Sequence, residues 1–398
     1  MSLVDLLEQA GLTGRGGAAF STATKVAAAH RHGASLIVNA CDGEIGAVKD
    51  AFVVEHHLPE LVRGATLVAG SRVRYAAHRG SATEARLRVA GLDVLAAPAR
   101  YVSSEETSLI SLARGGLARP MTKRAPFVAG GADSDGRRIA PTVVLNAETL
   151  WRVAQVVDRV DGPTWFRGLG LPDEPGPRLV AVGGAVPRPG IVETVAGTPL
   201  AQLLAAAGAD PGRTGPVVIG GLGGVVLRPE EAATVTWSRA GLAPYGGSPG
   251  PGVVHVLDPA VCPVDALAAW LDHAAGESAG QCGPCMFGLP AIAADWRELA
   301  VPGAGLRRTA PAWDRSVPGP AEPGPAGGNG HVHRAARERL ERRPRSVRGR
   351  GACRFPDGVA GLVTSALRAL SDHLDDHARG RCAAGQTPRS NHDHALAR

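Results

Sequence analysis

Cysteines with the spacing of metal or redox chemistry lie in the last third of the chain. Cys282 and Cys285 form a C-x2-C pair, and Cys353 follows in the segment RGRGACRFPDG. Such a pair fits zinc, an iron–sulfur cluster or a redox dithiol. The surrounding pattern is helical rather than strand-then-helix, which argues against a thioredoxin-like role. A metal site is therefore favoured, and zinc held with His273 or His331 is one alternative.

A glycine-rich loop close to the N-terminus is a second candidate site. Gly14-Arg15-Gly16-Gly17-Ala18-Ala19 matches the GxGxxA pattern of a dinucleotide-binding turn. That turn follows a strand, whereas a helical pattern precedes this loop, so the ordinary Rossmann interpretation fails. The backbone N–H groups are still suited to hold a phosphate, with Arg15 and Lys25 nearby. The alternative is a tight turn between helices. The second glycine cluster, 220–224, is interpreted as a turn between strands.

Lysine is rare in this chain. Lys25, Lys49 and Lys123 are the three lysines among 43 basic residues. Because an ammonium is a compact point charge and a guanidinium a wide planar fork, a lysine kept against this bias hints at a need for a small cation. For Lys49 a structural ion pair is as good an interpretation as a ligand contact.

Polar residues follow two predicted strands. The run SLIVN, residues 35–39, predicts a buried strand that ends at Asn39, and Asp42 and Glu44 come soon after it. Residues 142–145 predict another strand, and Asn146 is expected to be the N-cap of a helix through Val157. Ligands of α/β sheets bind at the carboxyl ends of strands. These side chains are therefore candidates, with an acidic turn and helix capping as the alternatives.

Two adjacent glutamates open a further predicted helix. Ser103 and Glu106 have the spacing of a capping box. Glu106 then has a structural role, whereas Glu105 has none, which makes Glu105 the stronger candidate for a ligand contact. The helix dipole also favours carboxylates in the first turn, so capping alone would explain both residues.

The elements around these residues predict three units. Residues 1–160 alternate helical and strand-like patterns, with further strands at 72–76 and 100–102, and are typical of a Rossmann-like α/β domain. Residues 178–258 carry strands around one short helix, which Thr198 is suited to cap, and predict a β-grasp-like domain. Residues 262–382 predict a helical domain interrupted by a Pro/Gly-rich insert at 302–330, and 383–398 a disordered tail.

Charge and composition exclude several classes of function. The isoelectric point near 9.3 comes from a basic segment at 331–350 that follows a Pro/Gly-rich stretch, which argues against nucleic-acid binding. No run approaches the ~20 apolar residues of a membrane span, and the start is unlike a signal peptide. Six cysteines in so long a chain indicate reduced thiols or a metal site, and hence a cytoplasmic protein.

Taken in order, these motifs resemble the flavin-bearing NADH-dehydrogenase subunit of respiratory complex I and its relatives in soluble hydrogenases and formate dehydrogenases. GLTGRGGAAFSTATK is similar to the family's flavin loop and IVNACDGEIGAVKD to its acidic loop. YVSSEETSL resembles the paired-glutamate segment, PTVVLNAETL the asparagine segment, and ESAGQCGPC with GRGAC the iron–sulfur motif. The resemblance runs from about Gly11 to Cys353, and the middle unit is similar to the family's soluble-ligand-binding (SLBB) β-grasp module.

The resemblance implies FMN, NADH stacked above it, and a nearby 4Fe–4S cluster. It implies that FMN is held by the Gly14–Gly17 loop, Lys25, Asn39 and Asn146. Phe20 matches an aromatic residue that packs on the nucleotide. Other matches are polar or basic–aromatic contacts to the nucleotides, from Glu44, Glu105, Glu106, and Phe127 with Lys123 or Arg124. Cys282, Cys285 and Cys353 match three of the four cluster ligands.

The chain also departs from the family pattern. Ala279 stands at the first of the four cysteine positions, so Cys382, Cys262 or a non-thiolate group would have to supply the fourth ligand. Other departures add side chains where backbone approaches the flavin: Ala19, Ser21, Ala23, Cys41, Asp42, Ser104 and Leu145.

The resulting prediction is an FMN-dependent NADH:acceptor oxidoreductase. Hydride transfer from NADH to FMN would be followed by one-electron transfer through the cluster to a ferredoxin-like or other redox partner subunit. Because the cofactor performs the reaction, we expect no catalytic base. The alternative is a degenerate paralogue that serves as a scaffold or regulatory subunit and binds flavin and cluster weakly or not at all.

Overall fold

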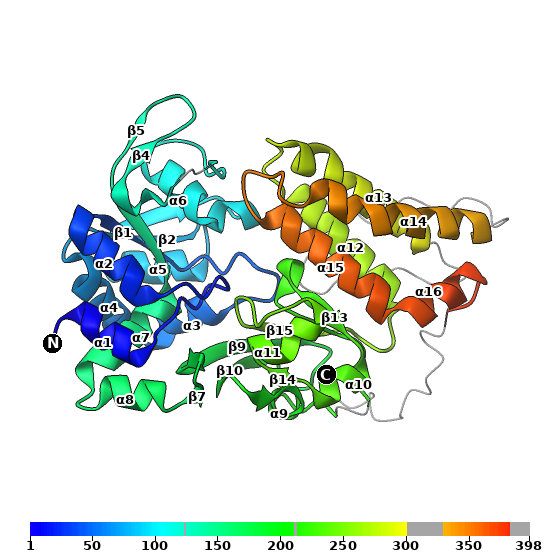
Figure 1. The fold of residues 1–398 in the computed structure, drawn as a ribbon, viewed down its shortest axis with the longest axis horizontal. Coiled ribbons are helices and arrows are strands. Elements are labelled where there is room, and N and C mark those ends of the chain that lie inside the picture. Colours follow the sequence, from blue (N-terminus) through cyan, green and yellow to red (C-terminus); the bar gives the residue numbers. More distant parts are fainter. Residues whose placement is uncertain (123–124, 211–212, 301–328, 383–398) are drawn as a thin grey trace.

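The computed structural model describes residues 1–122, 125–210, 213–300 and 329–382. These residues form an α/β unit, a mixed-sheet unit and a helical unit that follow one another along the chain (Figure 1). The predicted tail at 383–398 and nearly all of the predicted insert lie outside the described ranges. Among the described residues, every helix is too short or too polar to cross a membrane.

The α/β unit is built on a parallel sheet with the strand order β3-β2-β1-β6. Its strands are β1 (Ser35–Asn39), β2 (Val73–His78), β3 (Val94–Ala97) and β6 (Thr142–Asn146). Leu36 and Val38 of β1 enter one hydrophobic core and Ile37 the other, because side chains alternate across a strand. Both faces of the sheet are therefore covered.

Most helices of this unit pack on the face of Leu36 and Val38. They are α1 (Leu3–Ala10), α2 (Thr22–His32), α3 (Lys49–His56), α4 (Leu58–Ala69), α5 (Ala82–Val89), α7 (Ala147–Asp158) and α8 (Gly162–Arg167). The opposite face is covered by α6 (Glu106–Ala113) and the 3-10 turn η2 (Phe127–Ala129), next to the short strands β4 (Gly131–Ala132) and β5 (Arg138–Ile139).

Sequence patterns located most of these elements. The predicted strand at 35–39 coincides with β1, and the strand at 142–145 with β6, whose following helix has Asn146 as its N-cap. The strand predicted at 100–102 is wrong, because this segment forms the 3-10 turn η1 (Tyr101–Ser104) and the strand lies earlier, at β3. Ser103 Oγ donates to the carbonyl of Arg100 three residues earlier, a contact that a turn allows and an extended chain does not.

The middle unit is a five-stranded mixed sheet with the order β10-β9-β15-β12-β13. It contains β9 (Pro177–Gly184), β10 (Gly190–Val195), β12 (Val217–Ile219), β13 (Val225–Leu227) and β15 (Val253–Val256). The first and last strands, β9 and β15, are parallel neighbours at its centre, and the other pairings are antiparallel. The glycine cluster at 220–224 forms the turn η3 (Gly221–Gly223) between two strands, as predicted.

Shorter elements complete the middle unit. They are β7 (Gly170–Leu171), β8 (Glu174–Pro175), β11 (Thr198–Pro199), α9 (Leu200–Ala206), α10 (Pro229–Thr234), β14 (Thr236–Trp237), α11 (Arg239–Leu242) and η4 (Ala243–Tyr245). The expectation that Thr198 caps the short helix is wrong. Thr198 pairs with Trp237 in a two-stranded ladder, and Pro199 takes the N-cap position.

Among its described residues, the helical unit packs five α-helices around one core. They are α12 (Pro263–Gly276), α13 (Leu289–Leu299), α14 (Asn329–Val347), α15 (Phe355–Ala369) and α16 (Ser371–Ala378), with the π-helical turn η5 (Pro284–Gly288) before α13. The basic segment at 331–350 forms most of α14. Some of its arginines form ion pairs within the helical unit: Arg339 with Asp295 at 2.7 Å, Arg337 with Asp375 at 2.8 Å, and Arg343 with Asp295. The expectation that this segment does not bind nucleic acid stays a prediction.

Candidate functional site

The carboxyl ends of β1 and β6 form a topological switch point. Asn39 and Asn146 are register partners at the ends of these two neighbouring parallel strands. The chain leaves β1 towards β2 on one side of the sheet, whereas β6 lies on the other side. Ligands of open α/β sheets bind in the crevice at such a point. The structure therefore brings two of the predicted site residues together.

Both asparagine amides are held in place by local contacts. Asn39 Nδ2 donates to the Ser104 carbonyl at 2.9 Å, and its Oδ1 accepts from the Cys41 N–H at 3.1 Å. Asn146 Oδ1 accepts from the Thr149 N–H at 3.3 Å, which caps α7. Each amide nitrogen carries two hydrogens, so one bond does not exhaust its donor capacity.

The glycine loop lies against the N-terminus of α7. The Arg15 N–H donates to Thr149 Oγ1 at 2.9 Å, and a Cβ on Gly16 would lie 4.0 Å from Asn146 Cγ. Gly17 has a φ of +103°, and a Cβ there would stand 3.3 Å from the Gly250 carbonyl carbon of the middle unit. Glycine is required at Gly17 for both reasons. The loop thus presents backbone to the switch point, next to the positive end of a helix dipole.

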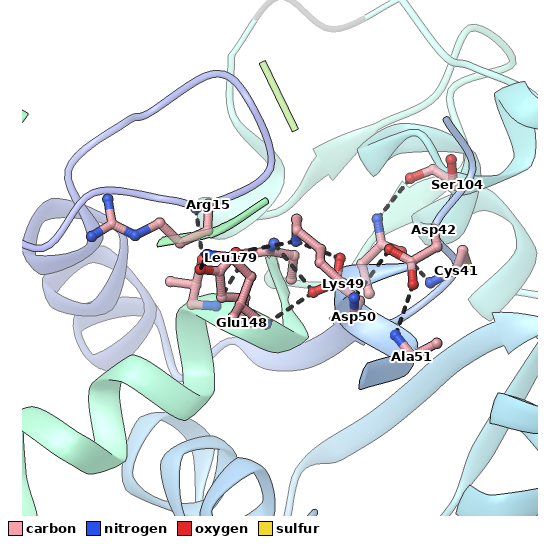
Figure 2. A network of polar contacts seen from close by, with 12 residues as sticks. Arg15, Cys41, Asp42, Lys49, Asp50, Ala51, Ser104, Glu148 and Leu179 are labelled. Atoms are coloured by element: carbon pink, nitrogen blue, oxygen red, sulfur yellow. Dashed lines mark hydrogen bonds and ion pairs between the residues drawn. The ribbon is translucent and has the colours of Figure 1, made fainter. Parts of the chain in front are cut away.

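Two side chains of the loop region point in different directions. Lys25, on α2, donates from Nζ to the Val144 carbonyl of β6 at 3.2 Å, close to the switch point. Arg15 is buried and turns away, with Nη2 donating to the Pro175 carbonyl at 2.9 Å (Figure 2). Its guanidinium also lies 5.4 Å from the centre of the Phe166 ring. Arg15 therefore fixes the loop to the start of the middle unit.

A buried ion network joins α3 to α7 beside the switch point (Figure 2). Lys49 Nζ lies 2.7 Å from Asp50 Oδ2 and 3.5 Å from Glu148 Oε2. Asp50 Oδ1 accepts from the Glu148 N–H at 2.9 Å and from Asn146 Nδ2 at 3.4 Å. Burial acts to lower the pKa of Lys49, but these carboxylates outweigh it and the pKa is raised. Lys49 is thus a structural ion-pair partner, which was one of its two interpretations.

The Asp42 side chain caps the N-terminus of α3. Its carboxylate accepts from the N–H groups of Asp50 at 3.1 Å and Ala51 at 2.7 Å. Its φ is +47°, a conformation that aspartate tolerates better than most residues. Burial and the nearby Asp50 charge raise the pKa of Asp42 to about 7. The sequence did not predict that Asp50 and Glu148 join this network or that Asp42 caps α3, because pairing across distant segments leaves no local pattern.

Glu44 connects the α/β unit to the middle unit. Its Oε1 accepts from the Leu222 N–H at 2.7 Å and its own neighbour Ile45 at 2.9 Å, and its Oε2 accepts from Tyr101 Oη at 2.7 Å. Burial raises the pKa of Glu44 to about 7, against these donors. Tyr101 also packs on the Phe355 ring at 4.4 Å. Glu44 therefore lies where all three units meet, and a nucleotide contact by it remains a prediction.

Glu105 has the capping role that was expected of the Ser103–Glu106 pair. Glu105, not Ser103, is the N-cap of α6, and its carboxylate accepts from Thr107 and Ser108. Ser103 Oγ instead donates to the Arg100 carbonyl at 2.6 Å inside η1. The predicted capping box is therefore wrong, because the chain enters the helix through a 3-10 turn. Burial raises the pKa of Glu105, and the ligand roles of Glu105 and Glu106 are not tested by these contacts.

The aromatic candidates differ in exposure. Phe20 is 53% exposed beside the glycine loop, so its ring is accessible to a ligand. Phe127 is 4% exposed and packs in the core against the α6 face of the sheet. Its expected basic partners, Lys123 and Arg124, lie outside the described residues. His78, at the carboxyl end of β2, was not anticipated, and its buried Nε2 has no hydrogen-bond partner among the described residues.

Cys282, Cys285 and Cys353 come together beside the paired-glutamate segment. Burial raises the pKa of Cys285 to about 12, with further contributions from Cys282 and Cys353. Burial raises the pKa of Cys353 to about 11, and Glu105 adds to the effect. The backbone of Ala279 contacts the Cys285 thiol. The three thiols are therefore near enough to influence one another's charge, and their role as cluster ligands stays a prediction.

The other two cysteines considered as a fourth ligand have different neighbours. Cys262 Sγ lies 3.4 Å from His373 Nε2, and Cys382 Sγ lies 3.6 Å from the same nitrogen. Both belong to the end of the helical unit where α16 lies. The segment before α15 that carries Cys353 lies at the opposite end, facing α6 (Figure 1). Neither cysteine is therefore placed to complete the set of three, and that expectation is corrected.

Comparison with known proteins identifies the family of this chain. Residues 7–155 match the Complex1_51K family, described as the Nuo51 FMN-binding domain. An F subunit of NADH-quinone oxidoreductase from Rhizobium meliloti (strain 1021) is 32% identical over an alignment of 326 positions that covers 74% of this chain and 74% of that protein. The chain belongs to the family of NADH-quinone oxidoreductase F subunits. The resemblance inferred from the motifs is confirmed.

More distant relatives match this member of the F-subunit family along almost its whole chain. The NADH-quinone oxidoreductase F subunit of Streptomyces coelicolor is 26% identical over an alignment of 409 positions that covers 95% of this chain and 83% of that protein. A chain of the NAD+-reducing NiFe-hydrogenase in its H2-reduced state superposes with a TM-score of 0.75 at 28% identity, covering 94% of this chain. The match spans 62% of that hydrogenase chain.

The residues at which this chain departs from the family pattern have different structural effects. Leu145 is buried in the core on the face of Leu36 and Val38, whereas Asn146 follows it on the other face. Ser104 Oγ donates to the Tyr101 carbonyl at 2.8 Å and fits closely against Gly43. Ala19 has a φ of +46°, in the left-handed region that favours the family's glycine. Of these three, Ala19 is the one under backbone strain.

Proposed function

We propose that this chain is an FMN-dependent NADH:acceptor oxidoreductase subunit that takes electrons in from NADH. The observation that carries the proposal is the switch point at Asn39 and Asn146, faced by the Gly14–Gly17 loop in a chain of this family. A Cβ on Gly16 would lie 4.0 Å from Asn146 Cγ, so this glycine keeps the loop backbone open towards the switch point, and such a loop next to a helix N-terminus suits a phosphate-bearing ligand. The residues present therefore fit FMN.

In this proposal each residue has a separate part in binding. The loop N–H groups and Lys25 would hold the FMN phosphate, and the amides of Asn39 and Asn146 would orient the rest of the molecule. The exposed Phe20 ring would cover the nucleotide that enters from solvent. When bound, FMN accepts a hydride from NADH and releases single electrons, while the protein supplies binding and orientation.

We propose that Cys282, Cys285 and Cys353 hold an iron–sulfur cluster with a fourth ligand that is not a cysteine. The three thiols are grouped and lie next to the segment that includes Tyr101 and Glu105, at the junction with the α/β unit. Thiolates are the usual ligands of such clusters, and the cluster potential depends on exposure and hydrogen bonds. An iron–sulfur group here would connect the flavin site to the surface of the helical unit.

We further propose that the middle unit is the β-grasp module of this family and that the electrons leave to a redox partner subunit. Its central parallel pair, β9 and β15, supports the β-grasp assignment. The named homologues and the hydrogenase neighbour are subunits or chains of larger redox enzymes by their names, which supports a protein acceptor. The ferredoxin-like nature of the partner follows only from the family resemblance.

The test is the visible spectrum of protein purified without oxygen, before and after NADH. We expect flavin bands that NADH bleaches. Lys25→Glu should lose bound flavin, because it replaces the phosphate ligand by a carboxylate, while Arg31→Glu reverses an exposed charge on the same helix and should keep it. Protein that stays colourless after reconstitution with FMN, iron and sulfide would instead support the degenerate-paralogue alternative.

A further inference from the structure

Four side chains with metal-ligating atoms meet where α12 begins and α16 ends. Cys262, His373, His377 and Cys382 each offer one ligand atom, and all four atoms lie within 4.8 Å of one another. Cys262 Sγ is 3.3 Å from His377 Nε2 and 3.4 Å from His373 Nε2. Cys382 Sγ is 3.6 Å from His373 Nε2. Two sulfurs and two imidazole nitrogens therefore surround one point.

These separations fit a single tetrahedral ion. Zinc binds thiolate sulfur at about 2.3 Å and imidazole nitrogen at about 2.0–2.1 Å, which places sulfur and nitrogen about 3.6 Å apart around a tetrahedron. The three observed sulfur–nitrogen separations of 3.3, 3.4 and 3.6 Å agree with this value. A cluster of several irons would spread its four ligands farther apart than one ion does. The arrangement therefore favours a mononuclear site.

Local structure explains why these residues converge. His373 and His377 are four residues apart on α16, so their rings lie on one face of the helix. Cys262 is the N-cap residue of α12, and Cys382 follows α16 by a few residues. One rigid helix thus supplies two ligands, and the chain segments that flank the helical unit supply the other two.

The hydrogen bonds around the site select the tautomer that a metal needs. His377 Nδ1 lies 3.0 Å from the Leu299 carbonyl, which can only accept, so Nδ1 carries the proton. The lone pair of His377 Nε2 then points at Cys262 Sγ. A metal-bound histidine commonly has such a backbone partner on its other nitrogen. Because one S–H group cannot serve two imidazole nitrogens at once, a cation between these atoms satisfies all of them together.

We propose that Cys262, His373, His377 and Cys382 bind one Zn2+ ion that closes the helical unit, separate from the flavin and the cysteines near α6. Binding releases two thiol protons, so two thiolates balance the charge of the ion and the imidazoles stay neutral. The ion ties Cys262, directly before α12, to Cys382 in the segment that follows α16. It therefore restrains the two ends of a unit whose chain also contains the long segment 301–328.

The experiment is metal analysis of the full chain, purified without a histidine tag. We expect about one zinc per chain in the wild type and about 0.1 or less in Cys382→Ser and His373→Gln, whose side chains are half-buried. Cys282→Ser and His333→Ala are the matched controls and should keep the zinc. His333 is a buried imidazole whose ring centre is 6.4 Å from that of His377, outside the four ligands.

A second measurement covers the case in which a variant does not fold. Zinc is removed from the wild type and Co2+ is added, and we expect the visible spectrum of tetrahedral cobalt with thiolate ligands. Wild-type protein that holds no zinc and gives no such spectrum would overturn the proposal. Zinc retained by folded Cys382→Ser would overturn it as well. Loss of iron and sulfide in His373→Gln, with zinc absent throughout, would assign the four residues to an iron–sulfur group instead.

Discussion

Replacing Lys49 by methionine should destabilise the α/β unit while leaving the shape of the side chain nearly unchanged. The Lys49 side chain is 3% exposed and lies 2.7 Å from Asp50 and 3.5 Å from Glu148. Methionine fills the space but leaves two buried carboxylates facing each other without a cation. Removing one partner of a buried ion pair costs about 3–5 kcal/mol, because the remaining charge is uncompensated. This loss is a large part of the stability of an ordinary domain.

The cost should also depend on pH. Burial and the Asp50 charge raise the pKa of the neighbouring Asp42 to about 7 although the Lys49 charge lowers it, so loss of that cation should raise the pKa of Asp42 further. A raised pKa in the folded state contributes stability at low pH that is lost as the pH rises. The difference in the free energy of unfolding between the wild type and Lys49→Met should therefore be small near pH 5 and large near pH 8.

Hydrogen–deuterium exchange of the backbone amides in α3 and α7 measures this loss of stability locally. A local measurement suits a chain that consists of several units. A loss of 3 kcal/mol corresponds to about 150-fold faster exchange. Arg63→Met is the control. The Arg63–Asp158 ion pair is about half exposed on both sides, so its loss should lower the free energy of unfolding by about 1 kcal/mol or less. Exchange that changes less than about fivefold, or equally at every pH, would refute the ion-pair reasoning.

Two further predictions follow from the backbone and from Glu44. Ala19→Gly should raise stability by about 1 kcal/mol and tighten FMN binding, because it relieves a φ of +46° in the loop; a lower melting temperature would contradict this. Glu44→Gln keeps an acceptor for the Leu222 N–H but removes a carboxyl group whose pKa burial raises from 4.5 to about 7. In the wild type this group makes the free energy of unfolding fall as the pH rises towards 7, and the variant should lack this contribution. Melting temperatures at pH 5 to 8 should then fall less steeply in the variant, and identical slopes would show that Glu44 does not titrate in this range.

Local sequence patterns predicted the parts of the site that depend on local chemistry. The strand SLIVN and its terminal Asn39, the cap at Asn146 and the glycine loop all follow from side-chain alternation and backbone propensity over a few residues. The paired glutamates show the limit of such patterns. The spacing of Ser103 and Glu106 fits a capping box, but the preceding 3-10 turn moves the cap to Glu105. Nothing in the local spacing distinguishes these two starts of one helix.

Contacts between distant segments could not be predicted from the sequence, because they depend on how the units pack. Arg15 looked like a phosphate ligand, yet its guanidinium is bound to Pro175 across the boundary with the middle unit. Glu44 looked like a ligand at a strand end, and the structure adds its partner Leu222, which is far away in the chain. In both cases a charged group found buried polar partners that bring its burial cost down.

By itself, the sequence determined the family, the parallel sheet and the residue types at the flavin loop, because motifs and alternation are local properties of the chain. The tertiary structure alone decided which cysteines belong together. Six cysteines spread along the chain give many possible groupings, and the packing of the helices separates Cys282, Cys285 and Cys353 from Cys262 and Cys382. The helix geometry of α16 then brings two histidines to the second group. Metal ligands must meet at one point in space, and only the folded chain defines that point.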